Sequence, residues 1–86
     1  MVIPQNEFIG QPIRNLQRFL REISNEYGQI QMVLPDGYYG ANTRRSVEDF
    51  QGIYGIAVTG QTDFETWNKI VEIYTEIIER NGEINN

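Results

Sequence analysis

The chain contains neither cysteine nor histidine among its 86 residues. Disulfides, metal sites built from these two residue types and catalysis by an imidazole base are therefore excluded. Long apolar runs are also lacking, since every stretch is far shorter than the roughly 18 residues that cross a membrane. Residues 1–7 have neither a basic leader nor a long apolar core, so no signal peptide is expected in this segment. The length predicts a single domain with a small core.

Basic residues are scarce in the C-terminal third of the chain. The formal net charge is −5, and residues 61–86 carry two basic against six acidic side chains. A protein that reads nucleic acid concentrates lysine and arginine on the element that meets phosphate. The charge pattern therefore disfavours nucleic acid and anionic membranes as partners. It also disfavours the DNA-binding helix-turn-helix that three short helices would otherwise suggest.

One short phrase occurs twice in the sequence. Residues 36–43 and residues 59–66 each form a glycine-containing turn that leads into an apolar helix pattern, with Gly37 matching Gly60 at an offset of 23. A self-match at a fixed period indicates a repeated supersecondary unit. Two such units cannot enclose a core, so a third helix is expected before them.

The apolar spacing predicts an all-α fold, a compact three-helix bundle with two pseudo-repeated turn-helix units. The first helix is expected to open at Pro12, because proline is well suited to a first helical turn. It should stop at Gly28 in a left-handed conformation. The second helix should run from about Ala41 to Gly55.

The third helix should start at a cap formed by Thr62 or Asp63 and should continue to about Arg80. Its apolar residues recur at steps of three and four and so predict one buried stripe. This stripe is expected to contain Phe64, Trp67, Ile70, Val71, Tyr74, Ile77 and Ile78.

The three helices account for residues 12–80, which leaves an N-terminal arm of residues 1–11 and a flexible C-terminal tail of residues 81–86. Apolar side chains of the arm are expected to cover Ile77 and Ile78 on the third helix. These side chains are Val2, Ile3, Phe8 and Ile9.

Four motifs follow one another along the chain. They are Leu16-Gln17-x-x-Leu20, residues 35–43 followed by Val47, Phe50-Gln51-x-x-x-Gly55-Ile56-x-Val58-Thr59-Gly60, and Thr66-Trp67. Over roughly residues 12–74, their order and spacing closely resemble the peptidoglycan-binding-like domain of bacterial cell-wall hydrolases. The family often has proline where this chain has Ala41 and Phe64, and its loss should loosen two helix starts slightly without changing the fold.

The resemblance implies a non-catalytic domain that binds peptidoglycan and tethers an attached or partner murein hydrolase. It also implies an extracellular place at the cell wall or spore cortex, reached by export as part of a longer chain. A protein–protein docking domain with the same fold and no murein binding is the alternative, because function depends on a surface rather than on the fold.

Most motif residues are interpreted as scaffold. Gly37 and Gly60 supply the positive φ that a tight turn needs. Asp36 is expected to accept a hydrogen bond within its own turn. Threonines are expected to bond to their helix ends, glutamines to brace loops and aromatic rings to enter the core. These residues are Thr43, Thr66, Gln17, Gln51, Tyr39, Phe50 and Trp67.

Tyr38 is the main candidate for ligand binding, because it precedes the buried Tyr39 position in an extended turn and should point toward solvent. Its ring would stack on a sugar face, while Asn42 would bond acetamido or hydroxyl groups and Arg44 would pair with a stem-peptide carboxylate. Tyr54 would extend this surface if it is half buried. Ordinary solvated turn residues are the alternative interpretation, and glycan and stem peptide both remain open as ligands.

Catalysis, metals and cofactors are not expected. A glycosidase needs two carboxylates that face each other across a cleft. Glu48 and Asp49 are helical neighbours that point to different sides, and the acidic residues Glu72, Glu76 and Glu79 fall on an outer helix face. No nucleophile motif or phosphate-binding loop is present.

Overall fold

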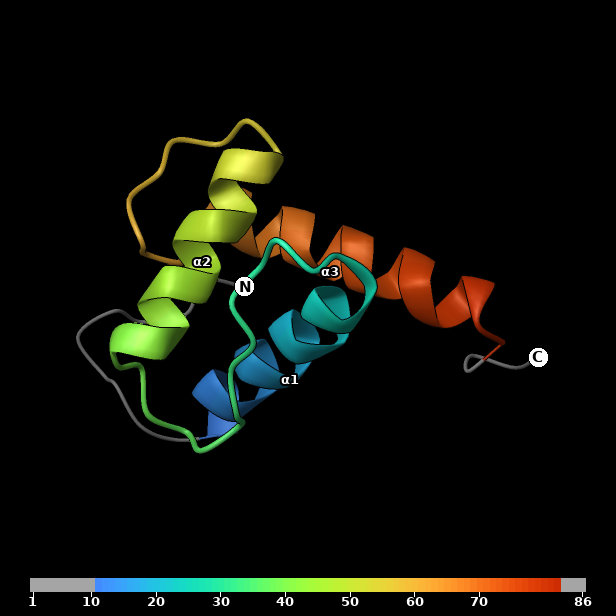
Figure 1. Ribbon diagram of the computed structural model, residues 1–86, viewed down its shortest axis with the longest axis horizontal. Helices are drawn as coiled ribbons and strands as arrows, with labels where there is room; N and C mark the ends of the chain where they lie inside the picture. The colour runs from blue at the N-terminus through green and yellow to red at the C-terminus, as the bar shows by residue number, and fades with distance from the viewer. Residues whose placement is uncertain (1–10, 83–86) are drawn as a thin grey trace.

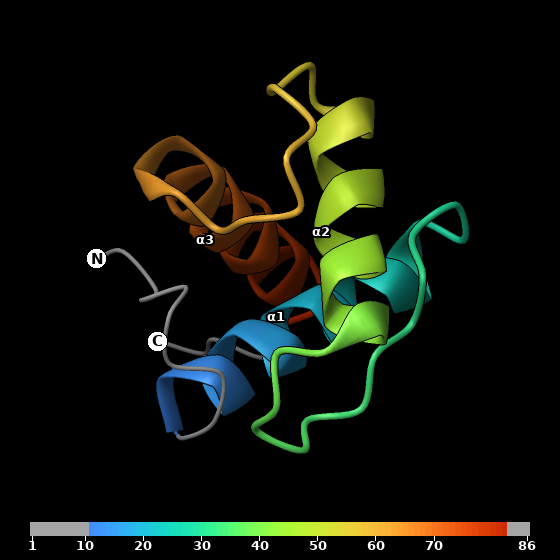
Figure 2. The same cartoon turned by 90° about the vertical axis from the view of Figure 1, so that its left-hand side faces the viewer.

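A computed structural model describes residues 11–82, which fold into three α-helices. They are α1 (Gln11–Glu26), α2 (Ala41–Ile53) and α3 (Phe64–Arg80). Helix α1 packs chiefly against α3 and less extensively against α2 (Figure 1). The two connecting loops pass on opposite sides of α2 (Figure 2). The predicted all-α three-helix bundle is confirmed, while the pseudo-repeat of its two turn-helix units stays a prediction.

The core lies where the three helices meet. Its fully buried apolar side chains recur at helical spacing on each helix, as the sequence pattern predicts. They are Ile13, Leu16, Leu20, Ile23, Val47, Phe50, Ile70 and Ile77. The rings of Tyr39, Phe50 and Trp67 are buried as predicted. Phe19 of α1 stacks on Tyr74 of α3 with 4.2 Å between ring centroids, which closes one side of the core.

The sequence left two candidates, Thr62 and Asp63, for the N-cap of α3. Asp63 is the N-cap, and its carboxylate accepts a hydrogen bond of 2.9 Å from the Thr66 N–H. This satisfies one of the N–H groups that the first helical turn leaves without a partner. Thr62 is instead fully buried in the preceding turn.

The expected burial of Phe64 is wrong, because 59% of this residue is exposed. The buried face of α3 includes Ile73, which the predicted stripe omitted. Each residue advances about 100° around a helix, so Phe64 points well away from the centre of that face. The buried residues of α3 are Thr66, Trp67, Ile70, Ile73, Ile77 and Ile78.

The predicted left-handed stop at Gly28 is also wrong. Positive φ occurs among the described glycines at 37, 55, 60 and 82, and not at Gly28. Helix α1 ends at Glu26, and the Ile30 N–H then bonds to the Tyr27 carbonyl at 3.2 Å. This β-turn reverses the chain with ordinary backbone angles, so no left-handed residue is needed.

The proposed cover of Ile77 and Ile78 by the N-terminal arm lies outside the described residues. Both isoleucines are buried within the part of the chain that the structure describes. No helix in that part is sufficiently long and apolar to span a bilayer.

Candidate functional site

The glycine-containing turn of residues 36–43, called the first turn below, is bound on its core side by Gln17, a fully buried residue of α1. The corresponding turn of residues 59–66 is called the second turn. Its Oε1 accepts a hydrogen bond from the Gly37 N–H at 2.8 Å. Its Nε2 lies within 3.0 Å of Asp36 Oδ1, the Tyr38 carbonyl and Thr43 Oγ1. One amide therefore fixes the backbone of the turn and the start of α2, so the expected loop-bracing role of Gln17 is confirmed.

The second turn is held in the same manner by Gln51 of α2, which is also fully buried. Its Oε1 accepts from the N–H groups of Thr59 and Gly60 at 2.9 and 3.0 Å. Its Nε2 donates to the Gln61 carbonyl and to Thr66 Oγ1, both at 3.0 Å. The loop-bracing role predicted for this glutamine is confirmed as well.

Both turns place glycine at the position that the buried glutamine contacts. Gly37 has φ of +82° and Gly60 has φ of +77°, as predicted. Only glycine adopts this conformation at little cost. The turns can therefore present these N–H groups inward, toward the buried glutamines.

Tyr39 joins the two turns, which the sequence did not indicate. Its hydroxyl donates to the Gly60 carbonyl at 2.7 Å and lies 3.1 Å from Thr62 Oγ1. Burial raises the pKa of this phenol above its ordinary value of 10.0. Sequence alone marks a buried ring at this position but not the partner of its hydroxyl.

A groove with a volume of about 380 Å³ runs between the α1–α2 loop and the start of α2. We refer to it as the first-turn groove. It is lined by Met32, Val33, Leu34, Asp36, Tyr38, Gly40, Ala41, Asn42 and Thr43. Tyr38 is 57% exposed, so the predicted solvent-facing position of this residue is confirmed.

The ring of Tyr38 lies directly against Gly40. A Cβ atom at position 40 would come within 2.5 Å of Cε2 of this ring. Gly40 has φ of −103°, which any residue adopts, so glycine here matters for the space that the ring occupies and not for the backbone. A side chain at position 40 would displace the exposed ring of Tyr38.

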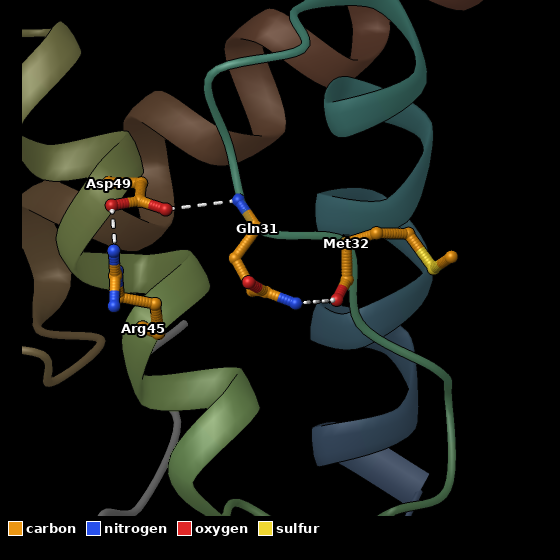
Figure 3. Close-up of polar contacts among 4 residues, drawn as sticks. All are labelled: Gln31, Met32, Arg45 and Asp49. Carbon is orange, nitrogen blue, oxygen red and sulfur yellow. Dashed lines mark hydrogen bonds and ion pairs between the residues drawn. The ribbon is translucent and has the colours of Figure 1, made fainter.

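The loop wall of the groove is attached to the outer face of α2 (Figure 3). The Gln31 N–H donates to Asp49 Oδ2 at 3.0 Å, and Asp49 Oδ1 lies 3.4 Å from Nε of Arg45. The Gln31 side chain donates to the Met32 carbonyl, and the Met32 side chain extends away from this cluster (Figure 3). The loop wall of the groove is therefore linked to α2 through Asp49.

The structure brings together only two of the four predicted ligand-binding residues. Tyr38 and Asn42 line the first-turn groove. Arg44 lies at the second turn, where its Cγ is 2.7 Å from the position of a Cβ at Gly60. Tyr54 is at the far end of α2, with its ring 4.7 Å from that of Phe50.

The sequence missed the loop side of the groove. Leu34 is 61% exposed and lines the groove, whereas its neighbour Val33 is buried. The signal was Pro35, which favours extended backbone at the residue before it, Leu34. Extended backbone alternates its side chains between two faces, so exposed residues at every second position were predictable.

A second depression, of about 360 Å³, lies over α1 and α3. It contains none of the predicted ligand-binding residues. Its lining consists of Arg18, Arg21, Glu22, Asn25 and Tyr74. In residues 11–82 no group of acidic side chains is placed to hold a metal ion.

Acid should destabilise the domain through Asp36 and Asp63. Hydrogen bonds from the Tyr38 N–H and the Gln17 amide lower the pKa of Asp36 from its ordinary 3.8, and the Thr66 hydroxyl and N–H lower that of Asp63. Depressed carboxyl pKa values contribute stability above the unfolded-state value, and this is lost as pH falls through the folded-state value. We expect the melting temperature to fall below about pH 4.

The variant Asp63→Asn tests this origin of the acid sensitivity. Asparagine still caps a helix but does not titrate. The decline of the melting temperature between about pH 4 and pH 2 should therefore be shallower than in the wild type. An unchanged decline would show that Asp63 does not contribute to it.

A comparison of the sequence with models of known protein families identifies the family of this domain. Residues 9–70 match the family described as "Putative peptidoglycan binding domain". The chain belongs to this family. Comparison with curated proteins and with solved structures gives no match. Membership in the peptidoglycan-binding family indicates binding rather than catalysis, peptidoglycan as the partner and association with the cell wall.

Proposed function

We propose that the chain is a non-catalytic recognition domain that binds peptidoglycan through the first-turn groove. It would hold an attached or partner murein hydrolase at the cell wall or spore cortex, as part of a longer exported chain. The observation that supports this proposal is the exposed Tyr38 ring, seated against Gly40 in a groove on a domain of this family.

The groove has the parts that a sugar–peptide polymer requires. The Tyr38 ring offers an apolar face for stacking, and the exposed amide of Asn42 offers both a donor and an acceptor. The site is small and open, so a single short ligand should bind with a dissociation constant on the order of 0.1–1 mM. Many equivalent sites on the polymer would raise the overall retention.

The carboxylates of the described residues support a non-catalytic role. Within residues 11–82, Asp36 is the only acidic residue that lines the first-turn groove. Glycoside hydrolysis requires a second carboxylate across the bond to be cleaved. Glu48 and Asp49 lie on α2 and outside the groove lining.

Retention on purified peptidoglycan sacculi, stripped of teichoic acid, tests the proposed function. The wild type should be retained, and Tyr38→Ala should reduce retention by about tenfold, because a stacked aromatic contact is lost. Phe64→Ala is a matched control, since Phe64 is equally exposed, at 59% against 57%, but lies outside the groove. It should leave retention unchanged.

Two results would count against the proposal. Equal retention of Tyr38→Ala and the wild type, with equal melting temperatures, would place binding on another surface. No retention of the wild type would contradict peptidoglycan binding and favour the protein–protein docking alternative.

A further inference from the structure

Among the described residues, Asp36 is the only charged one that lines the first-turn groove. Its Oδ1 accepts hydrogen bonds from the Tyr38 N–H at 2.9 Å and from the Gln17 amide at 3.0 Å. These two donors fix the orientation of the carboxylate. Within the described residues, Oδ2 accepts no hydrogen bond from the protein, so it is available to a ligand.

Among the described residues, no cation forms an ion pair with this carboxylate. The guanidinium of Arg14 packs over Gly37, with Cζ 3.2 Å from the position of a Cβ there, and its charge adds to the two hydrogen bonds in lowering the pKa of Asp36. Arg14 and Asp36 do not approach within ion-pair distance in the part of the chain that the structure describes. Arg44, predicted to bind a ligand carboxylate, lies at the second turn instead. The groove therefore favours a cationic group over an anionic one.

Apolar surface lies directly beside the carboxylate. The Asp36 N–H bonds to the Leu34 carbonyl at 2.8 Å, so the chain turns tightly between these two residues. Leu34 and Tyr38, one on each side of Asp36 in the sequence, are both more than half exposed. An aliphatic chain that ends in an amine matches this combination, since its methylenes would cover apolar surface and its ammonium would meet Oδ2.

The groove is poorly suited to a sugar chain alone. A sugar ring carries several hydroxyl groups, each of which needs a polar partner when it is taken out of water. Beyond Asp36, the polar side-chain groups that the described groove lining offers are the Asn42 amide and the Tyr38 hydroxyl, while Thr43 is buried and already bonded to Gln17. The alkyl side chains of a peptide, unlike the hydroxyl groups of a sugar, need no polar partner.

We infer that the first-turn groove recognises the stem peptide of peptidoglycan, with the free side-chain amine of its diamino acid paired to Asp36. The aliphatic part of that residue lies against Leu34 and Tyr38. This inference rests on the proposed function and narrows it from the polymer to one of its two components.

Two soluble stem tripeptides test the inference directly. Both carry an acetylated N-terminus and end in a diamino acid, but only one keeps the side-chain amine free. In an NMR titration, the free-amine peptide should shift the resonances of Leu34 and Tyr38. Acetylation of the side-chain amine should weaken binding about three- to tenfold, the range expected for an exposed, charge-assisted contact.

The variant Asp36→Asn supplies the complementary measurement. Asparagine keeps an oxygen for the Tyr38 N–H and the Gln17 amide but removes the charge. It should weaken the free-amine peptide about as much as acetylation does and should leave the acetylated peptide unaffected. Glu65→Gln is the matched control, because it removes one negative charge from the first turn of α3, outside the groove lining. Binding by Glu65→Gln should equal that of the wild type.

Different results would overturn the amine contact and the proposed binding of peptidoglycan. Equal binding of the two tripeptides to the wild type would overturn the amine contact without relying on any variant. Retention on sacculi together with binding to peptide-free glycan strands, and not to the tripeptides, would overturn the inference and leave peptidoglycan binding intact. No retention on sacculi would overturn both.

Discussion

Replacing Gln51 with leucine is expected to remove about 3 kcal/mol or more from the free energy of unfolding. Leucine is similar in volume but has no polar atoms, so the N–H groups of Thr59 and Gly60 lose their acceptor. Each buried group left without a partner costs about 1–3 kcal/mol. Gln17→Leu should cost about 1–3 kcal/mol, because one N–H, that of Gly37 in the first turn, loses its acceptor.

Urea denaturation of both variants measures this effect. A small domain has roughly 5–15 kcal/mol of total stability, so either change should move the midpoint strongly or unfold the protein. Gln29→Leu is the control, since Gln29 is exposed and should change stability by less than about 0.5 kcal/mol. If Gln51→Leu and Gln29→Leu denature at the same urea concentration, the buried glutamines do not stabilise the turns.

Replacing Phe50 with alanine is expected to cost about 3–5 kcal/mol, the usual range for a large ring deleted from a core. Phe50 is completely buried, and its ring lies 4.7 Å from that of Tyr54. The cavity would open between α2 and the rest of the core. Thermal or urea unfolding should show a large loss of stability.

The control for this change is Ile53→Ala on the same helix. Ile53 is 47% exposed, so its truncation should cost less than about 1 kcal/mol. A loss for Phe50→Ala no greater than that of the control would mean that the core relaxes into the space, contrary to the close packing expected of a protein interior.

Much of the fold could be predicted because its signals are local. Helical periodicity identified the buried rings of Phe50 and Trp67, and turn chemistry identified the positive φ of Gly37 and Gly60. The error at Phe64 has the same local origin. Apolar spacing alone does not fix the centre of the buried face of a helix, because that centre depends on the side chains packed against it.

Only half of the candidate site could be predicted, because the site depends on the directions in which side chains point from α2 and from the loop. The sequence alone does not give these directions. Asn42 and Arg44 are two positions apart on α2, and about 100° per residue separates them by roughly 200° around the helix. Asn42 therefore lies at the first turn and Arg44 at the second. Leu34 and Asp36 belong to the groove through the path of the loop, which is set by tertiary contacts with Gln17 and Asp49.

The attachment of the first turn to Gln17 has a consequence for how such a domain can change over time. The amide holds the backbone of the turn from the core side, through Gly37 and the Tyr38 carbonyl. The side chains at Tyr38 and Asn42 are exposed and are not needed for that support. New residues at these two positions would change the chemistry of the first-turn groove while leaving the architecture intact, so one scaffold can present different surfaces through very few substitutions.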